Sequence, residues 1–188
     1  MDDTVKYKNY IFKKYILHKD IISRIKDVAN CINEEYSHIA ASSKEKPVFL
    51  GVLTGSIYFM MDLLKSINFD YEIDFIKIKS YSDMKQKNVV FENADISKYG
   101  NRNIIIIEDI IDSGNTINLL YDKIMDSNPE KCSIVTLLKK EKIKNFDEDK
   151  IDYYGFEIKN KYVIGYGLDI NNLFRNLKDI YIKDGEEK

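Results

Sequence analysis

The stretch that most constrains the fold is residues 104–116, which read Ile-Ile-Ile-Ile-Glu-Asp-Ile-Ile-Asp-Ser-Gly-Asn-Thr. Four consecutive isoleucines make a strand apolar on both faces, which is typical of a central parallel strand covered on each side. Two carboxylates, Glu108 and Asp109, follow at the point where such a strand would reach the rim of its sheet. Open α/β sheets bind ligands beyond the carboxyl ends of their strands. The stretch therefore predicts a binding crevice.

A third carboxylate, Asp112, opens the polar turn Ser113-Gly114-Asn115-Thr116, and a helical pattern follows. The free backbone N–H groups at a helix start form an anion site, and Gly114 lets the backbone approach a ligand closely. Taken alone, the acids are equally consistent with a solvated turn, and the turn lacks the glycine spacing of a P-loop or a dinucleotide site. The combination is more specific. It predicts a phosphate cradle, acceptors for hydroxyls or a metal, and a candidate base.

Strand and helix patterns alternate along the rest of the chain. Apolar residues spaced by three and four predict a helix from Asp20, its expected N-cap, to Ile39. Residues 83–103 are polar, with only 89–91 indicating a short strand, and such an insert is usually functional or mobile. The alternation predicts an α/β fold, a parallel sheet with helices on both faces. Further strands are expected at 48–53, 71–79, 133–138, 153–157 and 162–167, and further helices at 57–67 and 116–127.

Length and charge narrow the class of protein. A chain of 188 residues is long enough for one well-buried core, so we expect a single domain over residues 1–188. A net charge of −2 gives no general attraction to nucleic acid or to an anionic membrane. No apolar stretch has the length of a bilayer span, and the N-terminus has no secretory pattern. Cys31 and Cys132 form no metal spacing and predict two buried thiols in a reducing cytosol, hence a cytoplasmic protein.

The strand, the acid pair, the third acid and the Ser-Gly-x-Thr turn together resemble the 5-phosphoribosyl-1-pyrophosphate (PRPP) signature of the type I phosphoribosyltransferases. Further matching segments occur in the family's order and spacing, so that from about residue 48 onward the chain resembles the hypoxanthine (hypoxanthine-guanine) phosphoribosyltransferases. These segments are 52–56, 79–81, 137–140, 161–169 and 171–177.

The resemblance implies a type I phosphoribosyltransferase fold, a twisted, mostly parallel sheet flanked by helices. A small hood would be built from N- and C-terminal segments, including about 150–175, and a mobile active-site loop would span about 81–100. The implied reaction is purine salvage. It moves the 5-phosphoribosyl group of PRPP to N9 of hypoxanthine, with guanine as a second expected substrate, and gives IMP or GMP and pyrophosphate. The family also implies a homodimer or homotetramer.

The implied site has one general base, Asp112, placed near purine N7. Glu108 and Asp109 would accept hydrogen bonds from the ribose hydroxyls and, with Asp169, hold Mg²⁺, a hard cation that prefers oxygen ligands. The other implied contacts are Ser113, Gly114, Asn115 and Thr116 to the 5′-phosphate, Lys140 to O6 of the base, Tyr162 and Val163 to the purine ring and its edge, Thr54, Gly55 and Arg175 to pyrophosphate, and Ser80 and Tyr81 in the mobile loop.

One departure and two alternatives accompany this interpretation. Thr54 stands where the family usually has Lys, so a positive charge is missing from the pyrophosphate loop, and the family's non-proline cis bond would fall between Leu53 and Thr54. A regulator with the same fold is the first alternative, and it predicts an added winged-helix domain or a basic face, neither of which is apparent. The second is a xanthine-preferring or pyrimidine homologue. Lys140 and the segment 162–169 argue against pyrimidines and leave xanthine open.

Overall fold

The computed structural model describes the backbone of residues 3–83, 86–92 and 95–185, with the side chains of all but 79–83, 86–90 and 92. Its larger sheet has six strands in the order β5-β4-β3-β6-β7-β8, five of them parallel, with β5 antiparallel at one edge. The predicted α/β fold with a mostly parallel sheet is confirmed. The strands are β3 (Val48–Leu53), β4 (Glu72–Asp83), β5 (Gln86–Glu92), β6 (Asn103–Ile111), β7 (Lys131–Lys140) and β8 (Tyr153–Ile158).

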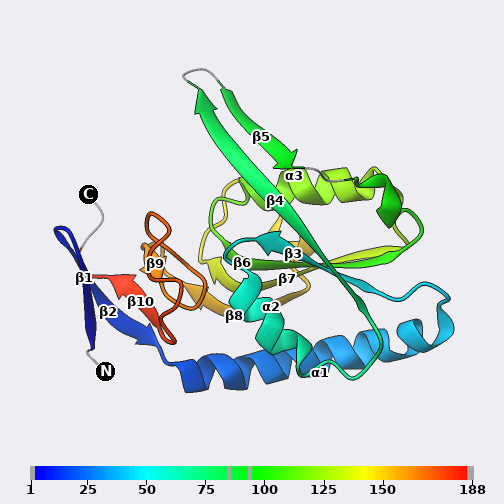
Figure 1. Cartoon of the computed structure of the whole chain (residues 1–188), viewed down its shortest axis with the longest axis horizontal. Helices are drawn as coiled ribbons and strands as arrows, with labels where there is room; N and C mark the ends of the chain where they lie inside the picture. Colours follow the sequence, from blue (N-terminus) through cyan, green and yellow to red (C-terminus); the bar gives the residue numbers. More distant parts are fainter. Residues whose placement is uncertain (1–2, 84–85, 93–94, 186–188) are drawn as a thin grey trace.

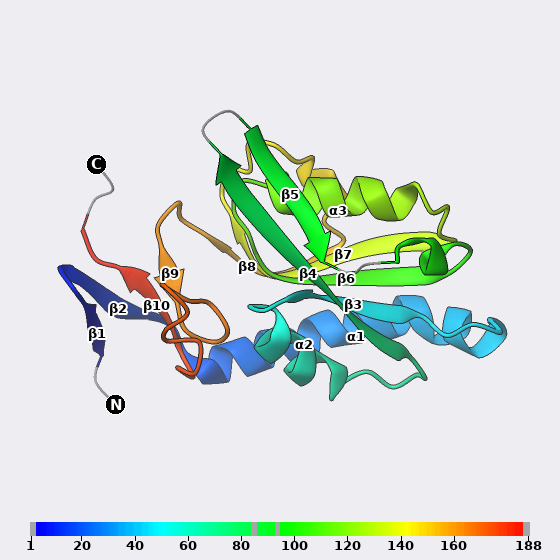
Figure 2. The same cartoon turned by 45° about the horizontal axis from the view of Figure 1, so that its top comes forward.

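The four isoleucines of the central strand β6 are fully buried and divide between two cores. Ile105 and Ile107 pack with helices α1 (His18–Ser42) and α2 (Ile57–Leu64), whereas Ile104 and Ile106 pack with α3 (Asn115–Met125). Figure 2 shows α1 and α2 on one side of the sheet and α3 on the other. Because burial of one such side chain contributes about 1.5–3 kcal/mol, this run fixes β6 at the centre of the sheet.

Helix α1 begins two residues earlier than the sequence predicts. Its first N–H group, that of His18, donates to the carboxylate of Asp179 at 2.7 Å, and Leu17 at the N-cap position makes no side-chain cap. The prediction of Asp20 as the N-cap is therefore wrong. Asp20 lies in the first turn, where a carboxylate interacts favourably with the helix dipole. The predicted burial of both thiols is wrong, because Cys31 in α1 is exposed and Cys132 is half-buried. No helix in the described part of the chain has the length and apolar character needed to cross a membrane.

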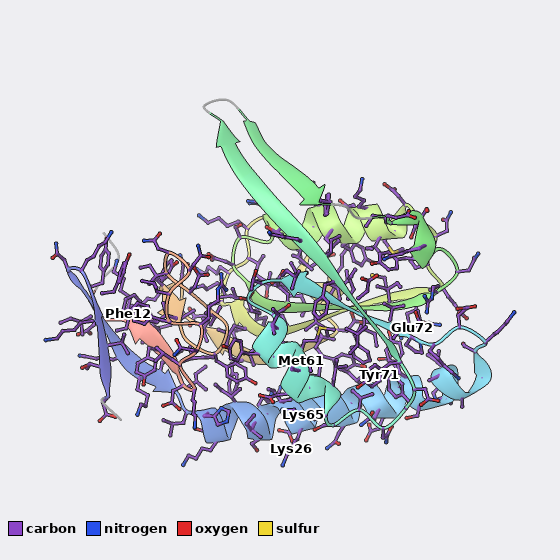
Figure 3. All side chains as sticks on the ribbon, in the orientation of Figure 1. Phe12, Lys26, Met61, Lys65, Tyr71 and Glu72 are labelled. Atoms are coloured by element: carbon purple, nitrogen blue, oxygen red, sulfur yellow. The ribbon has the colours of Figure 1, made fainter. Side chains whose placement is uncertain are left out.

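A smaller sheet stands at one end of the molecule and is built from N-terminal and C-terminal segments of the chain (Figure 1). It surrounds a small core that contains Phe12, labelled in Figure 3, and shares residues such as Val163 with the core of α1 and α2. The single domain over residues 1–188 stays a prediction. The strand order is β1-β2-β10-β9, and the strands are β1 (Thr4–Tyr7), β2 (Tyr10–Ile16), β9 (Val163–Ile164) and β10 (Ile180–Lys183).

The hood, expected to include about 150–175, requires correction at the start of this range. β8 pairs in parallel with β7 and belongs to the main sheet, because the register from Tyr153 to Ile158 buries Ile158 against the α1 core. β10, which lies beyond residue 175, completes the small sheet instead. The expected strand at 162–167 is also shorter. Positive φ angles at Gly165, Tyr166 and Gly167 turn the chain directly after β9.

The polar insert contains more structure than its sequence indicates. β4 continues to Asp83 and pairs with β5 as an antiparallel hairpin that projects from the body of the molecule (Figure 1). The ladder is made by backbone groups, so a polar sequence can form it without an apolar pattern. Residues 84–85 and 93–94 and the side chains of Ser80 and Tyr81 lie outside what the structure describes. The mobility of segment 81–100 stays a prediction.

The Tyr36 hydroxyl provides a test of the core between α1 and β7. It donates to the Ser133 hydroxyl at 2.8 Å, and both residues are fully buried. Tyr36→Phe removes one partner of a buried hydrogen bond, which costs about 1–3 kcal/mol of unfolding free energy. The double variant Tyr36→Phe/Ser133→Ala removes both and should recover part of that loss in urea unfolding. Equal loss in the single and double variants would contradict this assignment.

Candidate active site

The two acids predicted at the rim lie near the end of β6 and are held by its own backbone. The Asp109 N–H donates to Glu108 Oε1 at 3.1 Å, and the Ile110 N–H donates to Asp109 Oδ1 at 2.8 Å. Burial, together with the neighbouring carboxylate of Asp109, raises the pKa of Glu108 well above its ordinary value. Burial also raises the pKa of Asp109, against the opposing charge of Arg175. The pair would therefore gain from a cation or from hydroxyl donors.

Two glycines pack tightly behind this acid pair. A Cβ atom on Gly55 would lie 1.6 Å from Asp109 Oδ2, and one on Gly167 would lie 2.2 Å from the Gly55 carbonyl oxygen. The segments that contain Gly55, Asp109 and Gly167 are distant in the sequence, and they meet where neither glycine has room for a side chain. The peptide bond between Leu53 and Thr54 is cis, which confirms the expectation from the resemblance. Thr54 itself is exposed.

The predicted phosphate turn leads directly into α3. Gly114 stands at the N-cap position with φ +82°, a left-handed conformation that glycine adopts readily. The space where its Cβ would be is occupied by Ile143 and Phe146, so this position requires glycine for its conformation and its packing. Ser113 is exposed and accepts a hydrogen bond at 3.1 Å from the side chain of Asn115. A cavity of about 90 Å³ is lined by Glu108 and residues 110–117.

A larger cavity of about 380 Å³ lies beside the turn and contains the residues expected to hold the base. Lys140, at the end of β7, is only 4% exposed, and its ammonium donates to the carbonyl oxygens of Lys159, at 3.3 Å, and Lys161. Tyr162 is 46% exposed, and its hydroxyl donates to the Asp169 carbonyl at 3.0 Å. The lining consists of Asp109, Ile110, Asp112, Lys140, Asn160, Lys161, Tyr162, Val163, Leu168 and Asp169.

A third cavity, of about 280 Å³, joins the cis peptide loop to the acids. Arg175 projects into it and is held by an ion pair with Asp169 at 2.5 Å and by the Gly167 carbonyl at 2.6 Å. The charged residues of its lining are three carboxylates, Glu108, Asp109 and Asp169, against one guanidinium. A polyanionic ligand could not bind beside this excess of negative charge without a cation.

The carboxylates of the third cavity suit Mg²⁺, which takes only some of its ligands from a protein, better than a cation that takes all of its ligands from the protein. Within the residues that the structure describes, no three acidic, histidine or cysteine side chains converge as a ready metal cage. Mg²⁺ is usually held by one or two carboxylates together with substrate phosphates and waters. The adjacent oxygens of Glu108 and Asp109, facing a cavity large enough for phosphates, fit that manner of binding.

The structure brings the predicted residues together around these three cavities, at one edge of the sheet. We call the cavity of about 90 Å³ at the turn the phosphate cavity and the cavity of about 380 Å³ beside Lys140 the base cavity. Asp112 lines both the phosphate and the base cavity, and Asp109 lines both the base cavity and the third cavity. Sequence reasoning assigned no role to Asn160 or Leu168, which line the base cavity, or to Phe12, whose ring lies edge-on to Tyr162 at 6.4 Å. No local pattern marks Phe12, because its contact joins distant parts of the chain.

Comparisons with known proteins agree with this geometry. A family model described as "Phosphoribosyl transferase domain" matches residues 17–171. The hypoxanthine-guanine-xanthine phosphoribosyltransferase of Tritrichomonas foetus is 36% identical over 87% of this chain and 86% of its own length. The hypoxanthine-guanine phosphoribosyltransferase of Bacillus subtilis is 35% identical over 90% of this chain and 92% of its own. The chain belongs to the hypoxanthine-guanine phosphoribosyltransferase family.

Comparison with solved structures supports membership of the same family. A variant of the hypoxanthine phosphoribosyltransferase of Trypanosoma cruzi, solved in complex with the product IMP, superposes with a TM-score of 0.80. It is 28% identical in sequence, and the match covers 95% of this chain and 92% of that one. Membership of this family makes the protein an enzyme of the transferase class and confirms the type I phosphoribosyltransferase fold.

The buried acid pair predicts a cost in stability. Because burial raises the pKa of Glu108, the folded state holds its proton more tightly than the unfolded state does. Its contribution to stability is present at low pH and is lost as pH rises above the unfolded value, by about 1.4 kcal/mol per unit of difference. Glu108→Gln should therefore raise the unfolding free energy at pH 7, without ligands or Mg²⁺, and leave it nearly unchanged at pH 4.

Denaturant unfolding at several pH values measures this difference, and Glu141→Gln, at an exposed position, controls for the loss of one negative charge. A Glu108→Gln variant that is no more stable than the parent at pH 7 would show that the buried carboxylate carries no such cost.

Proposed function

We propose that the protein is a purine-salvage enzyme that transfers the 5-phosphoribosyl group from PRPP to N9 of hypoxanthine and of guanine. The observation that carries the proposal is the position of Asp112, which lines the phosphate cavity on one side and the cavity of Lys140 and Tyr162 on the other. A nucleoside monophosphate with its phosphate at the turn and its base beside Lys140 would span both cavities. The relatives named above support these substrates.

Lys140 would select the base. Its ammonium is a donor with no acceptor capacity, and the carbonyls of Lys159 and Lys161 fix its direction. A 6-oxopurine offers an acceptor at O6, whereas adenine offers an amino group and gains nothing there. The half-exposed ring of Tyr162 would stack on the purine face, and Val163 would contact the edge of the base through its backbone.

Asp112 would manage the proton of the purine. As N9 attacks C1′ and the bond from C1′ to pyrophosphate breaks, the imidazole ring of the base becomes more acidic. A carboxylate beside N7 can hold or accept that proton, and its exposed position next to both cavities places it within reach of a bound base. The acids of the crevice would also stabilise positive charge that develops on the ribose ring.

Pyrophosphate would leave through the third cavity, beside Arg175, whose guanidinium suits bidentate contacts with phosphate oxygens. Backbone N–H groups of the loop at Thr54 and Gly55 would serve the same group. Bound Mg²⁺, held by Glu108 and Asp109 with Asp169 nearby, would supply charge neutralisation for the departing pyrophosphate. The β4–β5 hairpin, which includes Ser80 and Tyr81, would close over the reactants and exclude water.

The protein would work as a homodimer or homotetramer in the cytoplasm, where a phosphorylated donor that does not cross membranes is available. Large apolar side chains that are 41–46% exposed on α2 and β4 support self-association. They are Tyr58 and Met61 on α2 and Ile73 and Phe75 on β4, and Figure 3 labels Met61.

An activity assay with purified protein, PRPP, Mg²⁺ and each purine tests the function directly. We expect nucleotide from hypoxanthine and guanine and none from adenine. Xanthine belongs in the same assay because the relative from Tritrichomonas foetus includes it in its name. Asp112→Asn should lower kcat by about 10²–10⁴-fold with little change in the KM for PRPP, whereas Asp126→Asn, an exposed acid at the end of α3, should not.

Absence of product from every 6-oxopurine would favour a regulator that retains the fold. Full activity of Asp112→Asn would keep the enzyme and remove this residue as the base.

Thr54→Lys tests the charge balance of the pyrophosphate loop. The three carboxylates of this cavity face a single guanidinium, so an added ammonium should lower the KM for PRPP by about 3–10-fold, equivalent to about 0.7–1.4 kcal/mol. The gain should shrink as salt rises. Thr54→Met, with similar length and no charge, is the control, and an equal gain in that variant would show that charge is not the cause.

A further inference from the structure

The connector between β7 and β8, residues 141–152, lies against the outer side of the phosphate turn. The Asn145 N–H donates to the Ser113 carbonyl at 3.0 Å. Phe146 and Ile143 occupy the space beside Gly114, with Phe146 Cβ 2.4 Å from where a Gly114 Cβ would be. The turn therefore has a ligand-facing side lined by its own residues and an opposite side filled by this connector.

The same connector also packs on the helix that the turn begins. The buried ring of Phe146 meets Tyr121 of α3 edge-on at 6.4 Å, and the Lys150 ammonium lies 4.9 Å from the centre of the Tyr121 ring. The connector contains only a three-residue 3-10 helix, η2 (Glu148–Lys150), so little regular structure of its own fixes its position. Contacts with the turn, with α3 and with the main sheet hold it in place.

Backbone hydrogen bonds tie both ends of the connector to the main sheet, from the Glu141 N–H to the Ile158 carbonyl at 3.0 Å and from the Asp152 N–H to the Ile134 carbonyl at 3.1 Å. An ion pair ties it as well. Lys139 of β7 donates to Glu148 at 2.9 Å, and the other oxygen of Glu148 accepts the Ile143 N–H at 3.4 Å. Lys139 also pairs with Glu157 of β8 at 2.7 Å. The two acids are similarly exposed, at 37% and 46% of their side chains, and they share one cation. Only Glu148 belongs to the connector, which makes Glu157 a matched control.

We propose that Glu148 is a positioning residue for the donor's 5′-phosphate, acting through the connector on the turn at residues 113–116. The ion pair with Lys139 holds Ile143 and Phe146 against Gly114, and this contact fixes the direction of the N–H groups that face the phosphate cavity. Glu148 touches no substrate itself. The proposal rests on the proposed function and deepens it. It attributes part of the affinity for the 5′-phosphate of PRPP to Glu148, which lines none of the three cavities.

Glu148→Gln and Glu157→Gln, measured side by side, test the proposal. Glu148→Gln should raise the KM for PRPP by about 3–10-fold and leave kcat and the KM for hypoxanthine within twofold, whereas Glu157→Gln should leave all three within twofold. Direct titration with ribose 5-phosphate and with pyrophosphate, both with Mg²⁺, should show weaker binding of ribose 5-phosphate alone in Glu148→Gln. Thermal unfolding should be similar in the two variants, because exposed ion pairs contribute little to stability.

Three results would overturn it: no change in Glu148→Gln, equal changes in both variants, or equal weakening of ribose 5-phosphate and pyrophosphate. Failure of the proposed function would look different. The unmodified protein would then form no nucleotide from any 6-oxopurine, whereas the ribose 5-phosphate titration reports on the turn without depending on catalysis.

Discussion

The site depends on two adjacent carboxylates at the end of the central strand, that of Glu108, which is buried, and that of Asp109, which is half-buried. Glu108 and Asp109 stay at the rim because β6 is fixed by isoleucines packed on both faces. The Asp109 carboxylate occupies the space that a side chain at position 55 would need. A buried carboxylate pair is unfavourable for the folded protein alone. It becomes useful when hydroxyl donors and a cation reach it, so the site is built for a ligand that brings both.

The three cavities of the crevice differ in the charged side chains that line them. The acids gather toward the cis peptide loop, where Arg175 provides the positive charge, whereas Lys140 lies at the floor of the base cavity. The phosphate turn, which adjoins both of these cavities, offers neutral N–H groups and no basic side chain of its own. A neutral acceptor on a base, a monophosphate and a metal-bound polyanion would each match the charge of one of these three places.

Local sequence patterns predicted the strands, the turn and the acids because each depends on residues within a few positions of one another. The isoleucine run and the turn at Gly114 are examples. The start of α1 could not be predicted, because its cap is Asp179, and neither could the length of β5, because backbone pairing leaves no mark on a polar sequence. Contacts such as that of Phe12 with Tyr162 join segments whose proximity exists only in the fold.

A crystal structure of the protein with bound IMP would test the central claim most directly. We predict that the phosphate contacts backbone N–H groups of residues 113–116 and that O6 lies within hydrogen-bond distance of the Lys140 ammonium. The Asp112 carboxylate should lie beside N7. A nucleotide bound with its phosphate away from this turn, or with its base outside the cavity of Lys140 and Tyr162, would contradict the account.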